Sequence, residues 1–380
     1  MKTKISRIFV LPLAAIAGLS LCCGAQQPAA GSAAGAAKAP VKEMHLPVAV
    51  IDKHGALVTN LSANDLTLMV DGRQQKIESL SAQNSLPYRL GLLVETSHAI
   101  YPAMESERKA LAKFLDQMQI ASGGSAPVNQ AFLIHFDREV ELLEDFTGAR
   151  DKLNREIDEL SPTSRQQSEP QGPESSGDDR GYGGQPRRRS DNQLYDAIYL
   201  ASNELMKPVE GRKSLIVLSD GVDHGSKETL NDAIDAADRA GVQIYTIYLR
   251  GQEERTGSEF PGSGRHGGLG GGYPGGGGGW PGSSGGGNNK RRDEESNVDG
   301  RKILEKIATR TGGHSFEAKK KENLEELYGL VANELHQQYV LTFVPDVTGD
   351  ADEFHKVVLS ATKGETTVEV PEGFYLTNGK

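Results

Sequence analysis

Two apolar runs of this chain end abruptly in side chains that carry oxygen. The first covers residues 88–94 and leads into Glu95 and Ser97, and the second covers residues 213–219 and leads into Asp220. Short apolar runs of this kind suit strands that are buried on both faces, as in a parallel sheet covered by helices. In open α/β sheets, ligands bind just outside the carboxyl ends of such strands. Because hard oxygen ligands suit a divalent cation such as Mg²⁺, we expect a cation site where the two runs end.

The segments around these runs alternate between strand and helix patterns over residues 86–337. Apolar side chains recur at helical spacing in residues 110–118, 153–160, 194–205, 230–237, 303–307 and 324–335, and strand-like runs lie at 131–136, 139–143, 242–249 and 315–316. Strands that alternate with helices predict an α/β fold with a doubly wound, mainly parallel sheet.

β-rich segments precede and follow this α/β unit. Residues 44–85 and 338–380 show strand periodicity and turn signals, and each segment is too small to bury a core alone. Because chain termini commonly lie close together, one domain can be inserted into another. We therefore expect 44–85 and 338–380 to pair in one small flanking β-sandwich, into which the α/β unit is inserted.

Two low-complexity insertions interrupt the α/β unit, at residues 161–190 and 250–298. The first is rich in Ser, Gln, Pro and Gly, and the second contains a long glycine tract. Neither can bury enough apolar surface to offset its chain entropy, so both are predicted to be disordered. Tyr273 and Trp280 in the second insertion could contact a partner, and the alternative is a tolerated low-complexity expansion.

The order of these motifs resembles the von Willebrand factor A-type (VWA) domain and its metal-ion-dependent adhesion site. That site opens with Asp-x-Ser-x-Ser after the first strand, and a threonine from a second loop and an aspartate after a later strand complete it. Here the opening reads Glu95-Thr-Ser-His-Ala99, and the segment that begins at Asn192 resembles the second loop, with Asn192 in place of threonine. Asp220 fits the last position. The resemblance implies Mg²⁺ or Ca²⁺ as the ion and four metal ligands, Glu95, Ser97, Asn192 and Asp220.

Three of the five positions depart from the usual site, including Asn192 in place of threonine, so the site is degenerate. Glu95 is one methylene longer than aspartate, so its carboxylate would overreach unless the loop shifts, and Ala99 removes one hydroxyl ligand. Mg²⁺ demands near-ideal octahedral geometry and dehydrates reluctantly, so both changes weaken its binding. We therefore favour a vestigial site, with a functional site that binds Mg²⁺ or Ca²⁺ weakly as the alternative.

The whole order of segments is also similar to that of exported VWA-related proteins described from Acidobacteria. The stretches at 48–55, 61–65 and 70–72 resemble the leader module of that group, and those at 307–313 and 338–341 resemble its closing module. This resemblance implies the fold and an exported location, and it implies little about the ligand.

The N-terminus has the pattern of a secretory signal peptide over residues 1–25. Basic residues precede an apolar run at 8–21 that is too short for a comfortable membrane span, and small residues follow it. Cleavage after Ala25 is expected, with lipidation of Cys22 or Cys23 as the alternative. A flexible linker over residues 26–43 would then begin a periplasmic or extracellular protein with no transmembrane span in the mature chain.

Composition and motifs narrow the function. The net charge of −10 argues against a nucleic-acid partner, which needs a basic face, and no ordered phosphate-binding glycine motif follows a strand. Ser97, Asp223 and His224 raise the alternative of a cryptic hydrolase, but no strained nucleophile elbow surrounds Ser97. We expect no catalytic or cofactor-binding residues, and we interpret the chain as a non-enzymatic binding or adhesion module for a protein or cell-envelope partner. A scaffold that assembles through its glycine-rich loops is a further alternative.

Overall fold

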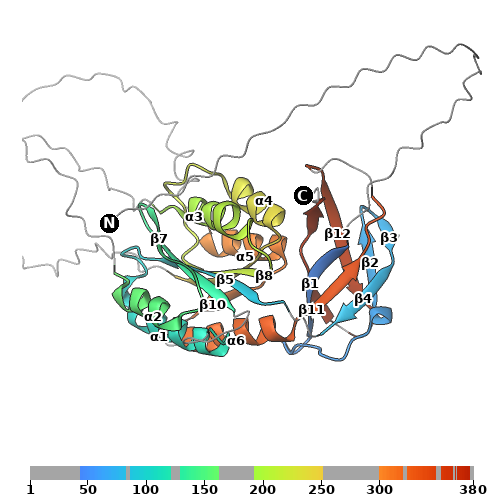
Figure 1. Ribbon diagram of the computed structural model, residues 1–380, viewed down its shortest axis with the longest axis horizontal. Coiled ribbons are helices and arrows are strands. Elements are labelled where there is room, and N and C mark those ends of the chain that lie inside the picture. The colour runs from blue at the N-terminus through green and yellow to red at the C-terminus, as the bar shows by residue number, and fades with distance from the viewer. Residues whose placement is uncertain are drawn as a thin grey trace, which may run out of the picture. The chain divides into compact units, whose positions relative to one another are not determined.

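The computed structural model describes residues 43–82, 86–120, 129–161, 192–250, 299–319, 323–347, 352–362, 364 and 366–376. The expected signal peptide, and nearly all of the linker and of the two low-complexity insertions, lie outside these residues. The described residues form an α/β unit with a mainly parallel sheet and two flanking antiparallel sheets (Figure 1). The predicted fold class is therefore confirmed.

The central sheet of the α/β unit has six strands in the order β10-β9-β8-β5-β6-β7. They are β5 (Tyr88–Glu95), β6 (Gln130–Phe136), β7 (Val140–Thr147), β8 (Arg212–Ser219), β9 (Gln243–Leu249) and β10 (Ser315–Ala318). Neighbouring strands are parallel except β6 and β7, which form an antiparallel hairpin at one edge. The chain starts in the middle of the sheet and extends it first on one side and then on the other, as in a doubly wound sheet. The carboxyl ends of β5 and β8 therefore meet where the strand order reverses, which is where such sheets bind ligands.

Helices cover both faces of this sheet (Figure 1). One face carries α1 (Met104–Gln117), α2 (Arg150–Glu159) and α6 (Leu324–Gln337), and the other carries α3 (Leu194–Leu200) with its π-helical continuation η3 (Ala201–Met206), α4 (Leu230–Ala240) and α5 (Gly300–Thr311). Leu90 and Leu92 of β5 belong to the first core and Leu93 to the second. A continuous apolar run is what a strand covered on both faces requires. Among the helices that the structure describes, none has the length and apolar character of a membrane span.

Local signals in the sequence set the ends of α4. The Thr229 side chain accepts a hydrogen bond from the Asp232 backbone N–H, and the Asp232 carboxylate accepts one from the Thr229 N–H, which is a capping box. Gly241 ends the helix in the left-handed conformation, at φ 65°. These caps fix α4 against the face of the sheet that also carries α3 and α5.

The flanking sheets contain strands from both ends of the described chain. One sheet has the order β13-β1-β11-β4 and the other β14-β12-β2-β3. Their bounds are β1 (Met44–Asp52), β2 (Leu66–Val70), β3 (Arg73–Gln75), β4 (Ile77–Ser81), β11 (Tyr339–Phe343), β12 (Phe354–Ala361), β13 (Thr366–Glu369) and β14 (Gly373–Tyr375), with short 3-10 helices at η1 (Ala63–Asp65) and, in the α/β unit, η2 (Tyr101–Ala103). β1 pairs with β11, and β2 pairs with β12, both antiparallel. Val48, Leu68 and Phe343 are fully buried in the core shared by the two sheets, so early and late segments complete each other.

Candidate metal and recognition site at the sheet rim

Glu95 is the last residue of β5 and lies at the rim where β5 and β8 end. The residue is 1% exposed, and both of its carboxyl oxygens accept hydrogen bonds. Oε1 accepts from the Ser97 hydroxyl at 2.5 Å. Oε2 accepts from the Ser219 hydroxyl at 2.7 Å and from the backbone N–H of Asp220 at 3.0 Å. The structure thus brings Glu95, Ser97 and Asp220 together.

The environment of Glu95 favours its protonated form. Burial and, second, the charge of Asp220 raise the pKa of Glu95 to about 8, although hydrogen bonds from Ser97, Ser219 and the Asp220 N–H favour the carboxylate. The fully buried Glu107 of α1 has no hydrogen-bond partner for either carboxyl oxygen among the described residues. Burial, with a smaller effect from Glu95, raises the pKa of Glu107 well above its usual range. At neutral pH Glu95 is therefore mainly protonated and brings little negative charge to a cation.

Asp220 supplies the negative charge of the rim and begins the loop after β8. Its Oδ1 accepts a hydrogen bond from the Val222 N–H at 2.9 Å, and burial raises its pKa. The next residue, Gly221, has φ +73°, and a Cβ added there would lie 2.1 Å from the backbone oxygen of Gly300. Only glycine fits this contact, so the loop that carries Asp220 is held against the start of α5.

Asn192, placed by the sequence on the second loop, is attached to the same part of the rim. Its backbone carbonyl accepts hydrogen bonds from the N–H groups of His224 and Gly225, at 2.9 and 3.2 Å. The residue is 3% exposed, yet its side-chain Oδ1 is buried with no hydrogen-bond partner among the described residues. A buried acceptor without a donor is unfavourable by about 1–3 kcal/mol. Such an oxygen is available to a cation or to a donor that binds at the rim.

The oxygens at the rim fit a weak cation site. Ser97, Asn192 and Asp220 offer a hydroxyl, an amide carbonyl and a carboxylate from three different loops, and Mg²⁺ and Ca²⁺ take ligands of this kind. Glu95 holds Ser97 and the backbone of Asp220 through hydrogen bonds from behind these oxygens, rather than presenting a free carboxylate. The set has low charge and, because residue 99 is alanine, lacks a hydroxyl at that position. A ligand set of this composition would bind a divalent cation only weakly.

Ser97 is not arranged as a catalytic nucleophile. Its hydroxyl donates to a carboxyl group, and no histidine is hydrogen-bonded to it in the part of the chain that the structure describes. His98 and His224 have exposed side chains. Asp223 accepts hydrogen bonds from the Ser226 hydroxyl at 2.6 Å and from the Tyr195 N–H at 3.2 Å, so it joins its own loop to the start of α3.

Two residues at the rim did not stand out in the sequence. Ser219 donates its hydroxyl to Glu95 and accepts a hydrogen bond from the Gly221 N–H at 2.9 Å. The sequence could have indicated Ser219, because it directly precedes Asp220 at the end of an apolar run. Glu107 had no such signal, because it follows Glu105 in the acidic first turn of α1 and resembles a solvent-facing residue.

A cavity of about 600 Å³ lies away from this rim. Its lining residues come mainly from α4 and α5 and are mostly polar or charged, namely Asn231, Ile234, Asp235, Lys302, Glu305, Lys306, Thr309, Arg310 and Glu372. Small-molecule sites are usually lined mainly by apolar side chains. The lining of this cavity is mostly polar or charged, so the cavity lacks that character.

The mainly parallel sheet of the α/β unit and its strand order are consistent with a VWA-like fold. No protein-family model matches the sequence, and no curated protein matches it. Solved structures are similar at low sequence identity. An aerotolerance-related membrane protein from Bacteroides fragilis, with multiple mutations to serine, is 14% identical with a TM-score of 0.38, over 65% of this chain and 99% of that one.

The descriptions of two further similar structures name a vWF domain and a MIDAS motif, respectively. The vWF domain of the type V pili tip protein Mfa5 from Porphyromonas gingivalis is 12% identical with a TM-score of 0.41, over 67% of this chain and 96% of that one. A proximal thread matrix protein from the mussel byssus, with a zinc-occupied MIDAS motif, is 11% identical with a TM-score of 0.42, over 67% of this chain. The match spans only 50% of the mussel protein.

Proposed function

We propose that this chain is an exported, non-enzymatic binding module that recognises a protein or cell-envelope partner at the rim formed by Ser97, Asn192 and Asp220. The observation that carries the proposal is the meeting of three loops at the switch point of the sheet, where the buried Oδ1 of Asn192 has no partner among the described residues. A rigid sheet that holds loops at its carboxyl edge is a common arrangement for recognition.

A weakly held divalent cation, Mg²⁺ or Ca²⁺, contributes to this recognition. Ser97 Oγ, Asn192 Oδ1 and the Asp220 carboxylate are its ligands from this chain, and Glu95 positions two of them from behind. Three ligands do not fill the six or more positions that these ions prefer, so a carboxylate of the partner can complete the set. An interface that forms without the ion, through the same loops, is the alternative within this proposal.

Calorimetry on the full chain tests the ion. We expect weak, saturable heat with Mg²⁺, Ca²⁺ or Mn²⁺ that is lost in Asp220→Ala and retained in Asp158→Ala, a matched change on the exposed face of α2. Binding of equal strength in both variants would place the ion elsewhere. No heat above that of buffer for the unmodified chain would show that the rim is vestigial as a metal site.

Capture of partners from a cell-envelope extract tests the recognition itself. The full chain and its Asp220→Ala variant are used as baits, each with and without chelator. A partner that binds the unmodified chain and is lost with Asp220→Ala supports the rim as the binding surface. Equal recovery with chelator favours the ion-independent interface, and recovery of no partner at all contradicts the proposal.

The geometry around Ser97 supports a non-enzymatic role, because its hydroxyl is bonded to Glu95 and not to a base. A panel of esterase, peptidase and phosphatase substrates tests this part. Turnover that disappears in Ser97→Ala would overturn it. The exported location rests on the N-terminal sequence, and detection of the chain in a periplasmic or extracellular fraction, with its N-terminus mapped, tests that location and the cleavage after Ala25.

A further inference from the structure

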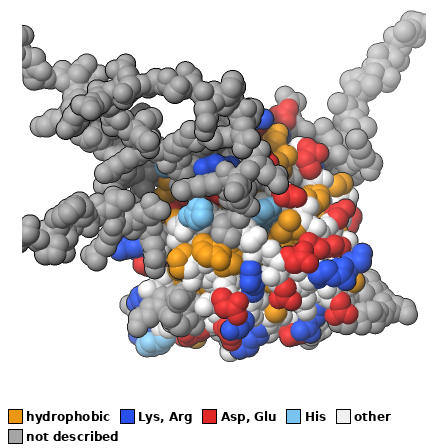
Figure 2. All heavy atoms as spheres, turned by 90° about the vertical axis from the view of Figure 1, so that its left-hand side faces the viewer, with side chains coloured by type: hydrophobic (Ala, Val, Ile, Leu, Met, Phe, Trp, Pro, Cys, Tyr) orange, Lys and Arg blue, Asp and Glu red, His pale blue; other side chains and the backbone are white. Residues whose placement is uncertain are grey.

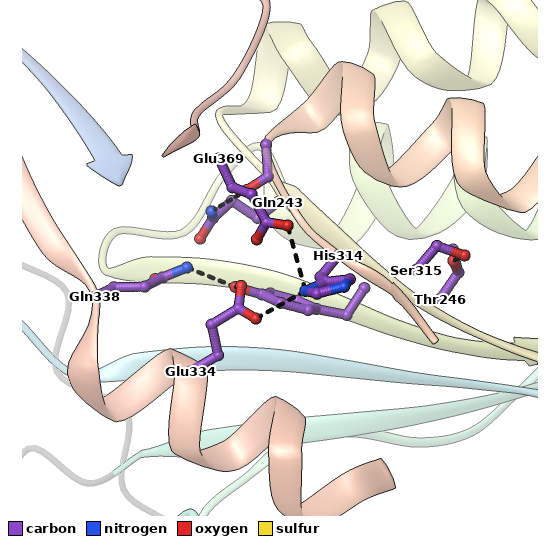
Figure 3. Close-up of polar contacts among 9 residues, drawn as sticks. Gln243, Thr246, His314, Ser315, Glu334, Gln338 and Glu369 are labelled. Atoms are coloured by element: carbon purple, nitrogen blue, oxygen red, sulfur yellow. Dashed lines mark hydrogen bonds and ion pairs between the residues drawn. The ribbon is translucent and has the colours of Figure 1, made fainter. Parts of the chain in front are cut away.

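A second cluster of metal-ligand side chains lies where the β-sandwich meets the α/β unit (Figure 3). It consists of His314, directly before β10, Glu334 of α6 and Glu369, the last residue of β13. His314 Nδ1 lies 3.2 Å from Glu334 Oε2 and 3.3 Å from Glu369 Oε1. One ring nitrogen therefore faces two carboxyl groups that come from different parts of the fold.

The two carboxyl groups have little compensating positive charge. Glu334 is 4% exposed, and Oε2 of Glu369 is buried without a hydrogen-bond partner among the described residues. In the described part of the chain His314 forms an ion pair with each of them, and no lysine or arginine does. When both carboxyl groups are ionised, their two negative charges exceed the single positive charge that a protonated His314 can supply. Buried charge of this kind is unfavourable unless it is paired or coordinates a metal.

The spacing of the ligand atoms suits a small tetrahedral ion. Ligands about 2.0–2.1 Å from Zn²⁺ lie about 3.3–3.4 Å from one another. The distances from His314 Nδ1 to the two glutamate oxygens are 3.2 and 3.3 Å, and all three ligand atoms lie within 4.8 Å of one another. Two of the three distances between ligand atoms therefore already match a zinc site. A small movement of the two carboxylates toward each other would bring the third distance into the same range.

Neighbouring side chains hold these ligands in place. The Tyr245 hydroxyl donates to Glu334 Oε1 at 3.1 Å, and Gln338 Nε2 donates to the Tyr245 oxygen at 2.5 Å. The His314 ring stacks on Phe316, with centroids 4.3 Å apart and an interplanar angle of 20°. Hydrogen bonds to ligating carboxylates and a fixed ring orientation are typical of protein metal sites.

We propose that His314, Glu334 and Glu369 bind one Zn²⁺ ion, with a fourth position open to water, and that this ion fastens the sandwich to the α/β unit. An imidazole nitrogen suits zinc, whereas Mg²⁺ and Ca²⁺ take oxygen ligands. This site is separate from the rim and takes a different ion. Its ligands also join β13, in the sandwich, to α6 and the loop before β10, in the α/β unit.

The test measures zinc bound by the full chain after equilibrium dialysis, with Cys22→Ser and Cys23→Ser in every protein so that no thiol competes. The ligand variants are His314→Gln and Glu369→Gln. The matched controls are His45→Gln and Glu372→Gln, which change the same residue types on the sandwich outside the cluster. We expect one zinc per chain in the parent and in both controls, and at least a 10-fold loss of affinity in each ligand variant.

Thermal unfolding gives a second readout that does not depend on the stoichiometry. Zinc at about 100 times its Kd should raise the Tm of the parent and the controls by about 5 °C or more, and it should not raise that of the ligand variants. Circular dichroism of the zinc-free variants shows whether they fold. Zinc binding that is unchanged in folded His314→Gln and Glu369→Gln overturns the proposal, as does a parent chain that binds no zinc at 100-fold molar excess. Loss of zinc in Asp220→Ala but not in His314→Gln would assign the ion to the rim.

Discussion

Replacement of Glu95 by glutamine should change how the stability of this protein depends on pH. The pKa of Glu95 rises from 4.5 to about 8 on folding, mainly because the group is buried. A raised pKa means that the folded state retains the proton that the unfolded state loses. The stability that Glu95 contributes is therefore full below pH 4.5 and is lost as the pH rises to about 8. Glutamine does not titrate, so the Glu95→Gln variant does not lose this stability as the pH rises.

The structure gives the size of the effect. The shift of 8 − 4.5 = 3.5 pKa units corresponds to about 5 kcal/mol between the two ends of the window. The glutamine amide can keep the local contacts, with its oxygen toward the Ser219 hydroxyl and the Asp220 N–H and its NH₂ toward the Ser97 oxygen, because a hydroxyl can donate or accept. Between pH 4.5 and pH 8.5 the free energy of unfolding of Glu95→Gln should therefore rise by several kcal/mol relative to that of the parent.

Urea unfolding in EDTA at a series of pH values measures this difference directly. Buried acids that do not interact with Glu95 titrate alike in both proteins and cancel in the comparison, whereas Asp220 and Glu107, which interact with it, contribute to the difference. Glu317→Gln, at an exposed position on β10, is the control and should follow the parent within about 0.5 kcal/mol. A difference between Glu95→Gln and the parent that stays constant within 1 kcal/mol across this range refutes the reasoning, because it means that Glu95 ionises in the folded state as it does in the unfolded state.

Three further predictions concern the frame that holds the rim and the sandwich. Gly221→Ala should destabilise the protein by more than about 2 kcal/mol, because its Cβ would lie 2.1 Å from the Gly300 oxygen, whereas Gly241→Ala, with no atom within 4 Å, should cost only about 1 kcal/mol in urea unfolding. Burial raises the pKa of Asp238 from 3.8 to about 7 despite the nearby Arg310. Between pH 4 and pH 8 the free energy of unfolding of Asp238→Asn should therefore rise by about 4 kcal/mol relative to that of the parent. A difference between the two proteins that does not change with pH would contradict this. A chain that ends at residue 338 loses β11 to β14, so the amides of β1 and β2 should exchange rapidly by hydrogen-exchange mass spectrometry; unchanged protection would show that these strands fold without the tail.

The sequence predicted the parts of this fold that depend on local pattern. The apolar run that ends at Glu95 places Leu90 and Leu93 in cores on opposite faces of the sheet, which is the property that the pattern indicates. Strand periodicity at both ends of the chain also predicted one shared sandwich, and the structure pairs β1 with β11 there, with Leu46 opposite Leu341. In these cases the residue pattern alone specifies which face is buried.

Other features depend on contacts that no local pattern contains. His314, Glu334 and Glu369 have no metal-ligand spacing in the sequence; packing of the α/β unit brings His314 to Glu334, and docking of the sandwich adds Glu369. The orphaned oxygen of Asn192 also depends on the exact positions of neighbouring donors. Glu107 is buried although it lies in an acidic helical turn, because α1 packs against α6 and α2 in the same core.

The two proposed ion sites differ in ligand type, and this affects how chelator experiments can be read. The rim offers only oxygen atoms, from Ser97, Asn192 and Asp220, which suit Mg²⁺ or Ca²⁺. The cluster at His314 adds an imidazole nitrogen to two carboxyl groups, which suits zinc. A chelator that abolishes partner capture could act on either site. Partner capture by two variants separates the two effects. Asp220→Ala removes the rim ligand and keeps the zinc cluster, whereas Glu369→Gln removes a zinc ligand and keeps the rim.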